Sequence, residues 1–526
     1  MPEKAHSRHR TAWQWAGAVL ASVGAGSASW AAPESDTAIT IYSSAQPGGV
    51  PAEYYRPLPG QAVPNAGEIP GYAMVRQDRK VDLTSGRTLL KFTDVAALID
   101  PTTVQFSSLT DPENTRVLEQ NFQFDLVSTD KLLSKYVDKN VLAQQAVGNQ
   151  VVEVSGMLLS SADGLVLRSG DGQIHALRQY SNLRFPELPG GLITQPTLVW
   201  DIASKKGGAH SARVTYQTGG MTWWTDYNLT FTPGVVTPGV ATPGSNANAG
   251  FLDVGAWVSI INQSGASYEN AKLKLIAGDV QRAAPPPRQY ARSMESATLS
   301  APASAGFVEK SFFEYHLYTL GRRTTLPNNS TKQVELFEAA KRVPARKIMV
   351  YYGQAGMYFG GGLMTDRDYG GGGSKKVDVY LEFKNEEKAG LGVPLPKGRI
   401  RVSQIDAADQ SLEFIGEDVI DHTPRNERVL VKLGSAFDVV GERKQLDFAI
   451  DTKGKWMEEE IEVKLRNHKR EPVEVLVKEN LYRWTNWSIK TTSHAVEKDD
   501  ARTVFFPVKV AADGQEALRY RVRYTW

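Results

Sequence analysis

Cysteine is absent from this chain of 526 residues. Its absence excludes disulfide bonds, cysteine nucleophiles, iron–sulfur clusters and zinc sites built on thiolates. The chain also has no excess of charge of one sign, because 60 lysines and arginines stand against 58 aspartates and glutamates. This balance gives no electrostatic reason to expect a nucleic acid as partner.

The familiar catalytic motifs are missing as well. The sequence has neither an H-E-x-x-H zinc motif nor a G-x-S-x-G nucleophile elbow. Ser128 and Lys131 have the S-x-x-K spacing of serine acyl-enzymes, but the K-T-G partner is lacking, so we interpret Ser128 as a helix cap. Glu417 and Asp418 are neighbours on a predicted strand and point to opposite faces, which argues against a carboxylate dyad. We therefore predict no catalytic residue, no metal site and no cofactor.

A segment with the layout of a secretory signal peptide opens the sequence. Basic residues from Lys4 to Arg10 precede an uncharged apolar stretch at 13–23, and small residues follow up to Ala31. The apolar stretch is well short of the ~20 residues that a transmembrane helix needs. We expect cleavage after Ala31 and a mature chain without a transmembrane helix. Its expected location is the periplasm or the medium, with association with the outer membrane as an alternative.

Strand-like runs of Val, Ile, Leu, Tyr and Phe, bounded by Gly, Pro, Asn and Asp, recur through the rest of the chain. Two segments cannot contribute to a core: 232–250 carries a Thr-Pro-Gly repeat, and 283–306 is rich in Ala, Pro and Ser. After the signal peptide at 1–31, these linkers divide the chain into three parts. They are a β-rich N-terminal region at 36–231 with a small β-barrel at 136–185, a strand pair at 251–282, and a C-terminal β-sandwich region at 307–526.

One local pattern occurs three times. An alternating strand ends in an asparagine, a polar turn follows, and a second strand returns; the three asparagines are Asn262, Asn385 and Asn467. Asparagine suits this position because its side chain can satisfy the backbone groups of a turn. Alternation buries one face of each strand, as in antiparallel sandwiches. We predict a mainly β protein built of immunoglobulin-like antiparallel sandwiches.

Stretches in the C-terminal half resemble a bacterial family of proteins. They are Gly390-Leu-Gly-Val-Pro-Leu-Pro-Lys-Gly398, Phe414-Ile-Gly-Glu-Asp-Val-Ile-Asp-His-Thr-Pro424, Leu433-Gly-Ser-Ala-Phe-Asp-Val-Val-Gly-Glu-Arg443 and the final Tyr520-Arg-Val-Arg-Tyr-Thr-Trp526. The combination is similar to domain-of-unknown-function family 4139, which includes proteins called mucoidy inhibitor A. The resemblance implies a β fold from about Asp253 onward and carries over no catalytic residue. The N-terminal part lacks the long coiled-coil insert of typical relatives, which suggests a distinct, exported branch.

The glycine-rich segment 354–374 is the most unusual feature of the sequence. Its Gly373-Ser374-Lys375 has the wrong order for a phosphate loop, and a strand rather than a helix follows. One interpretation is a plain hairpin tip. The other is a contact loop, since aromatic side chains beside charges suit binding surfaces. The candidate binding residues are Tyr358, Phe359, Asp366, Arg367 and Tyr369.

These features favour an exported, non-catalytic protein that acts through binding or envelope structure, with an unidentified protein or envelope polymer as partner. One alternative is a hydrolase acting on cell-envelope polymers, with its site at a domain junction. Another is an outer-membrane β-barrel, because apolar residues and arginines alternate along 518–526 up to an aromatic terminus.

Overall fold

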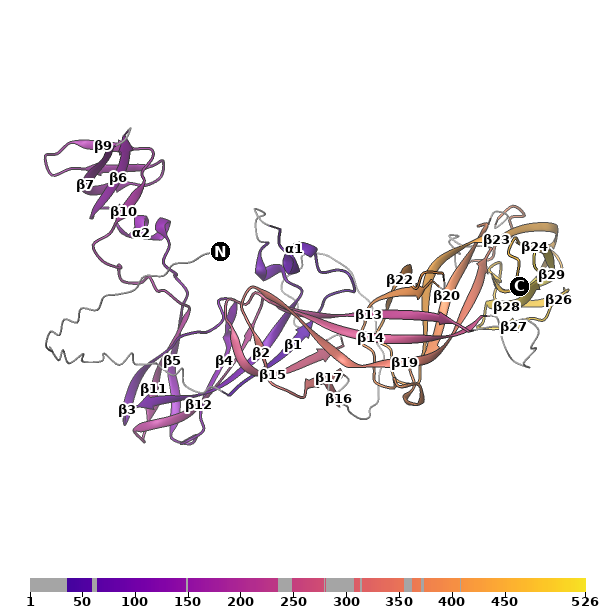
Figure 1. Cartoon of the computed structure of the whole chain (residues 1–526), viewed down its shortest axis with the longest axis horizontal. Coiled ribbons are helices and arrows are strands. Elements are labelled where there is room, and N and C mark those ends of the chain that lie inside the picture. Colours follow the sequence, from indigo (N-terminus) through magenta and orange to yellow (C-terminus); the bar gives the residue numbers. More distant parts are fainter. Residues whose placement is uncertain are drawn as a thin grey trace, which may run out of the picture.

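The computed structural model describes residues 36–58, 64–147, 150–234, 248–278, 280, 307–312, 315–353, 362–369, 373–406 and 408–526. The predicted fold class is confirmed, since multi-stranded β-sheets make up most of this part of the chain and its helices are short. The molecule is elongated (Figure 1), and three long strands run along its middle. They are β13 (Met221–Pro233), β14 (Ala249–Asn262) and β19 (Ser330–Tyr352).

An N-terminal sandwich packs two sheets around Trp200. The larger sheet has the order β16-β17-β15-β1-β2-β12-β4 with β18 beside β15: β1 (Asp36–Ser43), β2 (Gly71–Leu83), β4 (Ile99–Ser108), β12 (Gly208–Thr218), β15 (Tyr268–Ala277), β16 (Phe307–Phe312), β17 (Tyr315–Leu320) and β18 (Thr324–Leu326). The smaller sheet consists of β3 (Gly86–Phe92), β11 (Thr197–Ser204) and β5 (Thr115–Gln123). The buried Trp200 ring contacts Phe92 and Phe106, and its indole N–H donates to Gln120 at 2.7 Å. The polar edge of this indole is therefore satisfied inside the core.

Three successive hairpins share one topology. Each pairs a first strand with a second that ends in or beside one of the predicted asparagines: β13 with β14, β19 with β20 (Lys376–Lys384), and β23 (Arg428–Asp451) with β24 (Trp456–Asn467). The strand after the asparagine does not pair with the strand before it. Instead β15, β21 (Gly398–Ile405) and β25 (Val473–Asn480) run parallel to β1, β13 and β19, respectively. The two strands within 251–282, expected as a pair, accordingly lie in different sheets.

The three asparagines are buried and make the same hydrogen bonds. Each side-chain amide donates to a carbonyl of its own turn and to a carbonyl just before the next long strand, while its oxygen accepts an N–H of the turn. For Asn467 these partners are Glu471 at 2.8 Å, Ala511 at 2.9 Å and the Lys469 N–H at 3.0 Å. The equivalent partners are Ala266, Leu326 and Ser264 for Asn262, and Val393, Pro424 and Gly392 for Asn385. We call the turn that joins two strands unpaired with each other at each of these asparagines an arch. An arch leaves backbone groups without ladder partners, and the asparagine supplies these partners.

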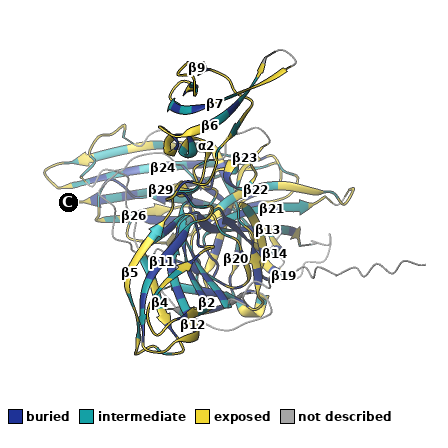
Figure 2. Cartoon of the chain, turned by 90° about the vertical axis from the view of Figure 1, so that its left-hand side faces the viewer, coloured by how far each residue is buried: buried dark blue, intermediate teal, exposed yellow. Residues whose placement is uncertain are grey.

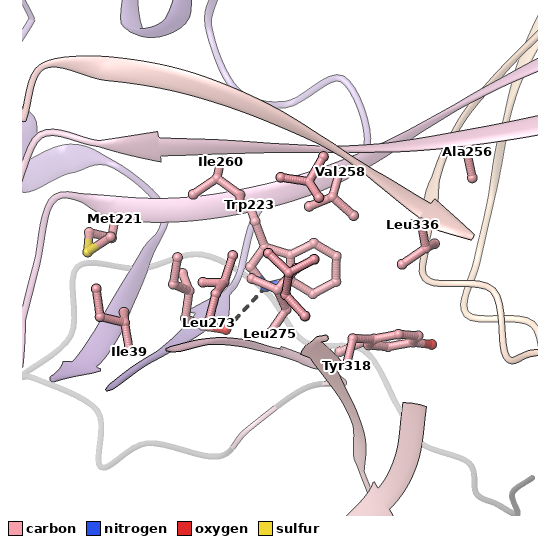
Figure 3. Packing of buried hydrophobic residues seen from close by; sticks show 14 of the residues in the cluster. Ile39, Met221, Trp223, Ala256, Val258, Ile260, Leu273, Leu275, Tyr318 and Leu336 are labelled. Carbon is pink, nitrogen blue, oxygen red and sulfur yellow. Dashed lines mark hydrogen bonds between the residues drawn. The ribbon is translucent and has the colours of Figure 1, made fainter. Parts of the chain in front are cut away.

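Apolar residues on alternate positions form the core, as the alternation predicts. Along β24, every second residue from Met457 to Asn467 is buried (Figure 2). In the first arch, Trp223 of β13 lies among Val258 of β14 and Leu275 of β15, and its indole N–H donates to the Ile41 carbonyl at 3.2 Å (Figure 3). We call each of the three hairpins, together with the strand after its asparagine, a repeat. One hydrophobic core continues from the first repeat through the second, and a separate core fills the third repeat.

The segment predicted to be a small β-barrel is instead an open sheet. Its order is β10-β6-β7-β8-β9: β6 (Asn140–Val147), β7 (Gln150–Ser160), β8 (Leu165–Arg168), β9 (Ile174–Leu177) and β10 (Asn182–Arg184). The edge strands β9 and β10 have only four and three residues, and within the described ranges no ladder joins them. The sheet, with its own core, stands apart from the sandwich on the connection between β5 and β11 (Figure 1).

The helices of the described residues are short. They are α1 (Ala52–Tyr55), α2 (Thr129–Lys135) and the 3-10 turns η1 (Ala66–Glu68) and η2 (Glu387–Ala389). Ser128 caps α2 as predicted, because its hydroxyl accepts the Lys131 N–H at 3.3 Å. In the ranges that the structure covers, no helix has the length and apolarity needed to cross a bilayer.

The final strand, β29 (Gln515–Thr525), lies between β24 and β26 (Trp487–Thr492). The outer-membrane hypothesis would place its apolar face against lipid. In the structure this face is buried in the core of the third repeat, at Leu518, Tyr520, Val522 and Tyr524. Its arginines stand opposite glutamates of β24 in the register Arg519–Glu462, Arg521–Glu460 and Arg523–Glu458. Opposite charges on facing positions stabilise the solvent side of the sheet.

Candidate functional site

The predicted binding loop lies partly within the described residues. Tyr358 and Phe359 fall outside them. Asp366, Arg367 and Tyr369 belong to the segment 362–369, which we call the anchored loop. Asp366 and Arg367 are exposed and Tyr369 is partly buried, so the loop combines a polar surface with an aromatic base.

Arg483 binds the backbone of the anchored loop from the protein core. Its side chain is fully buried, and its guanidinium donates to the carbonyls of Met364, Asp366, Arg367 and Tyr369 at 2.7–3.3 Å. Its Nε donates to the Glu459 carboxylate at 2.8 Å. A planar guanidinium with five N–H groups suits this task, because it can bind several oxygens at fixed angles.

A second buried ion pair lies next to Gly353 and Gly373, the two glycines that flank 354–372. Arg443 Nε donates to both carboxylate oxygens of Glu479 at 3.1 Å, and both side chains are at most 1% exposed. A Cβ built on Gly353 would lie 2.6 Å from the Arg443 side chain, and one built on Gly373 would overlap the Gly353 backbone. Because they have no side chains, Gly353 and Gly373 can approach each other closely beside Arg443.

Two tyrosines complete the buried network. Tyr520 donates its hydroxyl to Glu479 at 2.7 Å, and Tyr524 donates to Glu459 at 3.0 Å. Burial and the neighbouring carboxylates raise the pKa of both phenols well above the ordinary value. The hydroxyls thus stay protonated as donors, and both carboxylates are bonded by an arginine and a phenol.

Three further hydrogen bonds fix the conformation of the anchored loop. The Asp368 N–H donates to the Asp366 carboxylate at 2.9 Å, and the Gln445 amide donates to the Arg367 carbonyl at 3.2 Å. The Tyr482 hydroxyl donates to the Tyr369 carbonyl at 2.7 Å. With the backbone held in this way, the side chains of Asp366, Arg367 and Asp368 are exposed to solvent and form a polar surface on a fixed backbone.

The acidic residues around 417–421 serve structural roles. Glu417 pairs with Arg401 at 3.0 Å, and the Asp418 carboxylate accepts the Lys432 N–H at 2.6 Å. Asp421 accepts the N–H of His422. Across the described ranges, no three His, Asp or Glu side chains converge in a metal-binding arrangement.

A niche at the junction between the N-terminal sandwich and the second repeat is where the hydrolase hypothesis would place a site. It is a shallow hollow with about 300 Å³ of non-atom space that includes open solvent, and its lining is mainly apolar, with Trp223, Trp224, Lys397 and His422. None of its lining residues is a carboxylate. The niche therefore lacks the acid and base pair that a glycosidase requires.

Comparison with known proteins gives no further guide: no family model matches the chain, and no curated protein matches it significantly. The resemblance of the C-terminal half to family 4139 therefore stays a prediction.

The buried network was not predicted from the sequence, although the sequence carries a sign of it. Glu459 stands in phase with Met457 and Ile461, and Glu479 stands in phase with Val475 and Val477. A carboxylate at an apolar position of an alternating strand implies a buried partner. Alternation alone does not reveal which arginine that partner is.

Proposed function

We propose that this protein is an exported binding protein of the bacterial envelope and that the anchored loop is part of its contact surface. The export signal, the sandwich architecture and the absence of catalytic motifs from the sequence support this proposal. The loop supplies two carboxylates and a guanidinium on a fixed backbone, which suits a polar partner such as an envelope polymer or a protein.

The observation that carries the proposal is a pair of buried salt bridges, one beneath the anchored loop and one beside its flanking glycines Gly353 and Gly373. Burying an arginine and a glutamate costs several kcal/mol per ion in desolvation, and apolar residues of similar size often give equal or greater stability. Stability alone is therefore a poor reason to place Arg443–Glu479 and Arg483–Glu459 side by side. Fixing the conformation of 362–369 is a better explanation, because the Arg483 guanidinium donates hydrogen bonds to four backbone carbonyls of that loop.

Photocrosslinking in the producing cell tests the loop even though its partner is unidentified. Thr365 is exposed and adjoins Asp366, so benzoylphenylalanine at 365 is expected to give a specific adduct on irradiation. The variant Asp366→Ala/Arg367→Ala is expected to reduce that adduct at least tenfold, with a change in unfolding free energy within about 0.5 kcal/mol. The same crosslinker at the exposed Lys490 on β26 is the control. Equal adducts from 365 and 490, or no effect of the double variant, would reject the loop as the contact surface.

Export has its own test. In the periplasmic fraction of the producing bacterium, the protein is expected to begin at Ala32, because cleavage after Ala31 fits the small-residue rule. Intact mass and N-terminal sequencing measure this directly. A cytoplasmic protein that retains its first residues would contradict the proposal.

A further inference from the structure

The hairpin of β21 and β22 (Leu412–Ile420) ends in an uncovered strand edge. β22 is the last strand of the long sheet, and its ladder joins it to β21 alone. Near its C-terminal end it lies close to β23, because a Cβ on Gly416 would be 2.6 Å from the Leu433 carbonyl oxygen. The outer end of the β21–β22 hairpin stands out from the body of the molecule (Figure 2).

This end of the hairpin exposes large apolar side chains. Phe414 is 62% exposed, Leu412 is 60% exposed, and Ile405, the cross-strand partner of Leu412, is 41% exposed. Edge strands are usually protected by lysine, proline or a covering segment, since an apolar edge invites another strand to pair. Residues 405–414 contain neither lysine nor proline.

The outer part of the hairpin, from 402 onward, carries only negative charge, whereas Arg399 and Arg401 lie at the inner end of β21 and pair with Asp226 and Glu417. Residues 402–424 contain six acidic side chains and no lysine or arginine: Asp406, Asp409, Glu413, Glu417, Asp418 and Asp421. Glu417 and Asp418 are bonded to neighbouring strands, as described above. Asp406, Asp409 and Glu413 are exposed, and their side chains bond to Ala408 and Ser411 of the same hairpin. The outer part of the hairpin therefore carries negative charge and has no lysine or arginine of its own between 402 and 424.

The apolar side chains and the negative charge together determine which kind of partner could bind this edge. Two copies of this edge would bring like charges together, and an anionic lipid surface would be repelled. We propose that the edge of β22 at 412–415 is a docking site for an extended segment of another protein in which aliphatic and basic residues alternate. The aliphatic side chains lie with Leu412 and Phe414 on one face, and the basic side chains lie with Glu413 on the other.

A synthetic peptide of alternating valine and lysine is the probe, and fluorescence anisotropy with the full chain is the measurement. We expect saturable binding that weakens with salt. Leu412→Ser/Phe414→Ser and, separately, Glu413→Lys are each expected to weaken it at least tenfold. Leu446→Ser removes an exposed leucine from the β23–β24 hairpin and is the matched control with unchanged binding. All substituted residues are exposed, so thermal melts should coincide.

Two further peptides separate strand addition from simple charge attraction. A valine–glutamate peptide and a lysine peptide with proline at alternate positions are both expected not to bind, since proline cannot extend a sheet. Equal binding of the proline peptide, or variants that bind like the wild type, overturns the proposal. So does a dimer of the wild-type chain, or binding to anionic vesicles, that is lost in Leu412→Ser/Phe414→Ser. Asp366→Ala/Arg367→Ala leaves this binding unchanged, which keeps the test independent of the anchored loop.

Discussion

Replacing Arg483 with methionine is expected to lower the free energy of unfolding of the third repeat by about 3–5 kcal/mol. The substitution removes the partner of Glu459, which is 1% exposed, and leaves a buried carboxylate with the Tyr524 hydroxyl as its remaining bond in the network. It also removes the donors that hold four carbonyls of the anchored loop. Urea denaturation followed by tryptophan fluorescence measures the loss, because Trp484 and Trp487 pack against this core.

The matched control is Arg519→Met. Arg519 also pairs with a glutamate of β24, but its side chain is 61% exposed, so the expected cost is at most about 1 kcal/mol. The double variant Arg483→Met/Glu459→Leu is expected to recover part of the stability, since it no longer buries a lone charge. A double variant as unstable as the sum of its single variants would show that Arg483 and Glu459 do not act as a pair. Loss of the crosslink from position 365 in a double variant that folds would tie the arginine to the loop.

Asn467→Ala is expected to destabilise the same repeat by about 2–4 kcal/mol, because two turn carbonyls and one N–H lose their partner in a buried site. Asn467→Asp is expected to be at least as harmful above about pH 5, since a carboxylate would face the carbonyl oxygens of Glu471 and Ala511. Thermal and urea unfolding give both values.

An asparagine outside the arches provides the control for this effect. Asn486 is exposed, and its substitution by alanine is expected to change the unfolding free energy by no more than about 0.5 kcal/mol. Similar losses for Asn467→Ala and Asn486→Ala would mean that the arch does not depend on the side-chain bonds.

The sequence predicted the parts of the fold that depend on local pattern. Asn262, Asn385 and Asn467 marked the three arches because each ends an alternating strand before a polar turn. The partner of each returning strand was not predictable, since alternation specifies which face is buried and not which neighbour completes the ladder. β15, for example, pairs with β1, which lies at the opposite end of the N-terminal region in the chain. For the same reason the anchored loop was found by its composition, while the arginine beneath it was not.

The long strand β19 has a mechanical consequence. It has 23 residues, of which 330–346 pair with β14, 345–351 with β20 and 349–352 with β25, so one strand joins strands of all three repeats. At ~3.3 Å per residue such a strand reaches about 75 Å. Over this length, continuous backbone ladders join β19 to β14, β20 and β25. We therefore expect the span along β19 to be stiff, whereas the small sheet of β6–β10 stands outside these ladders on the connection between β5 and β11 (Figure 1).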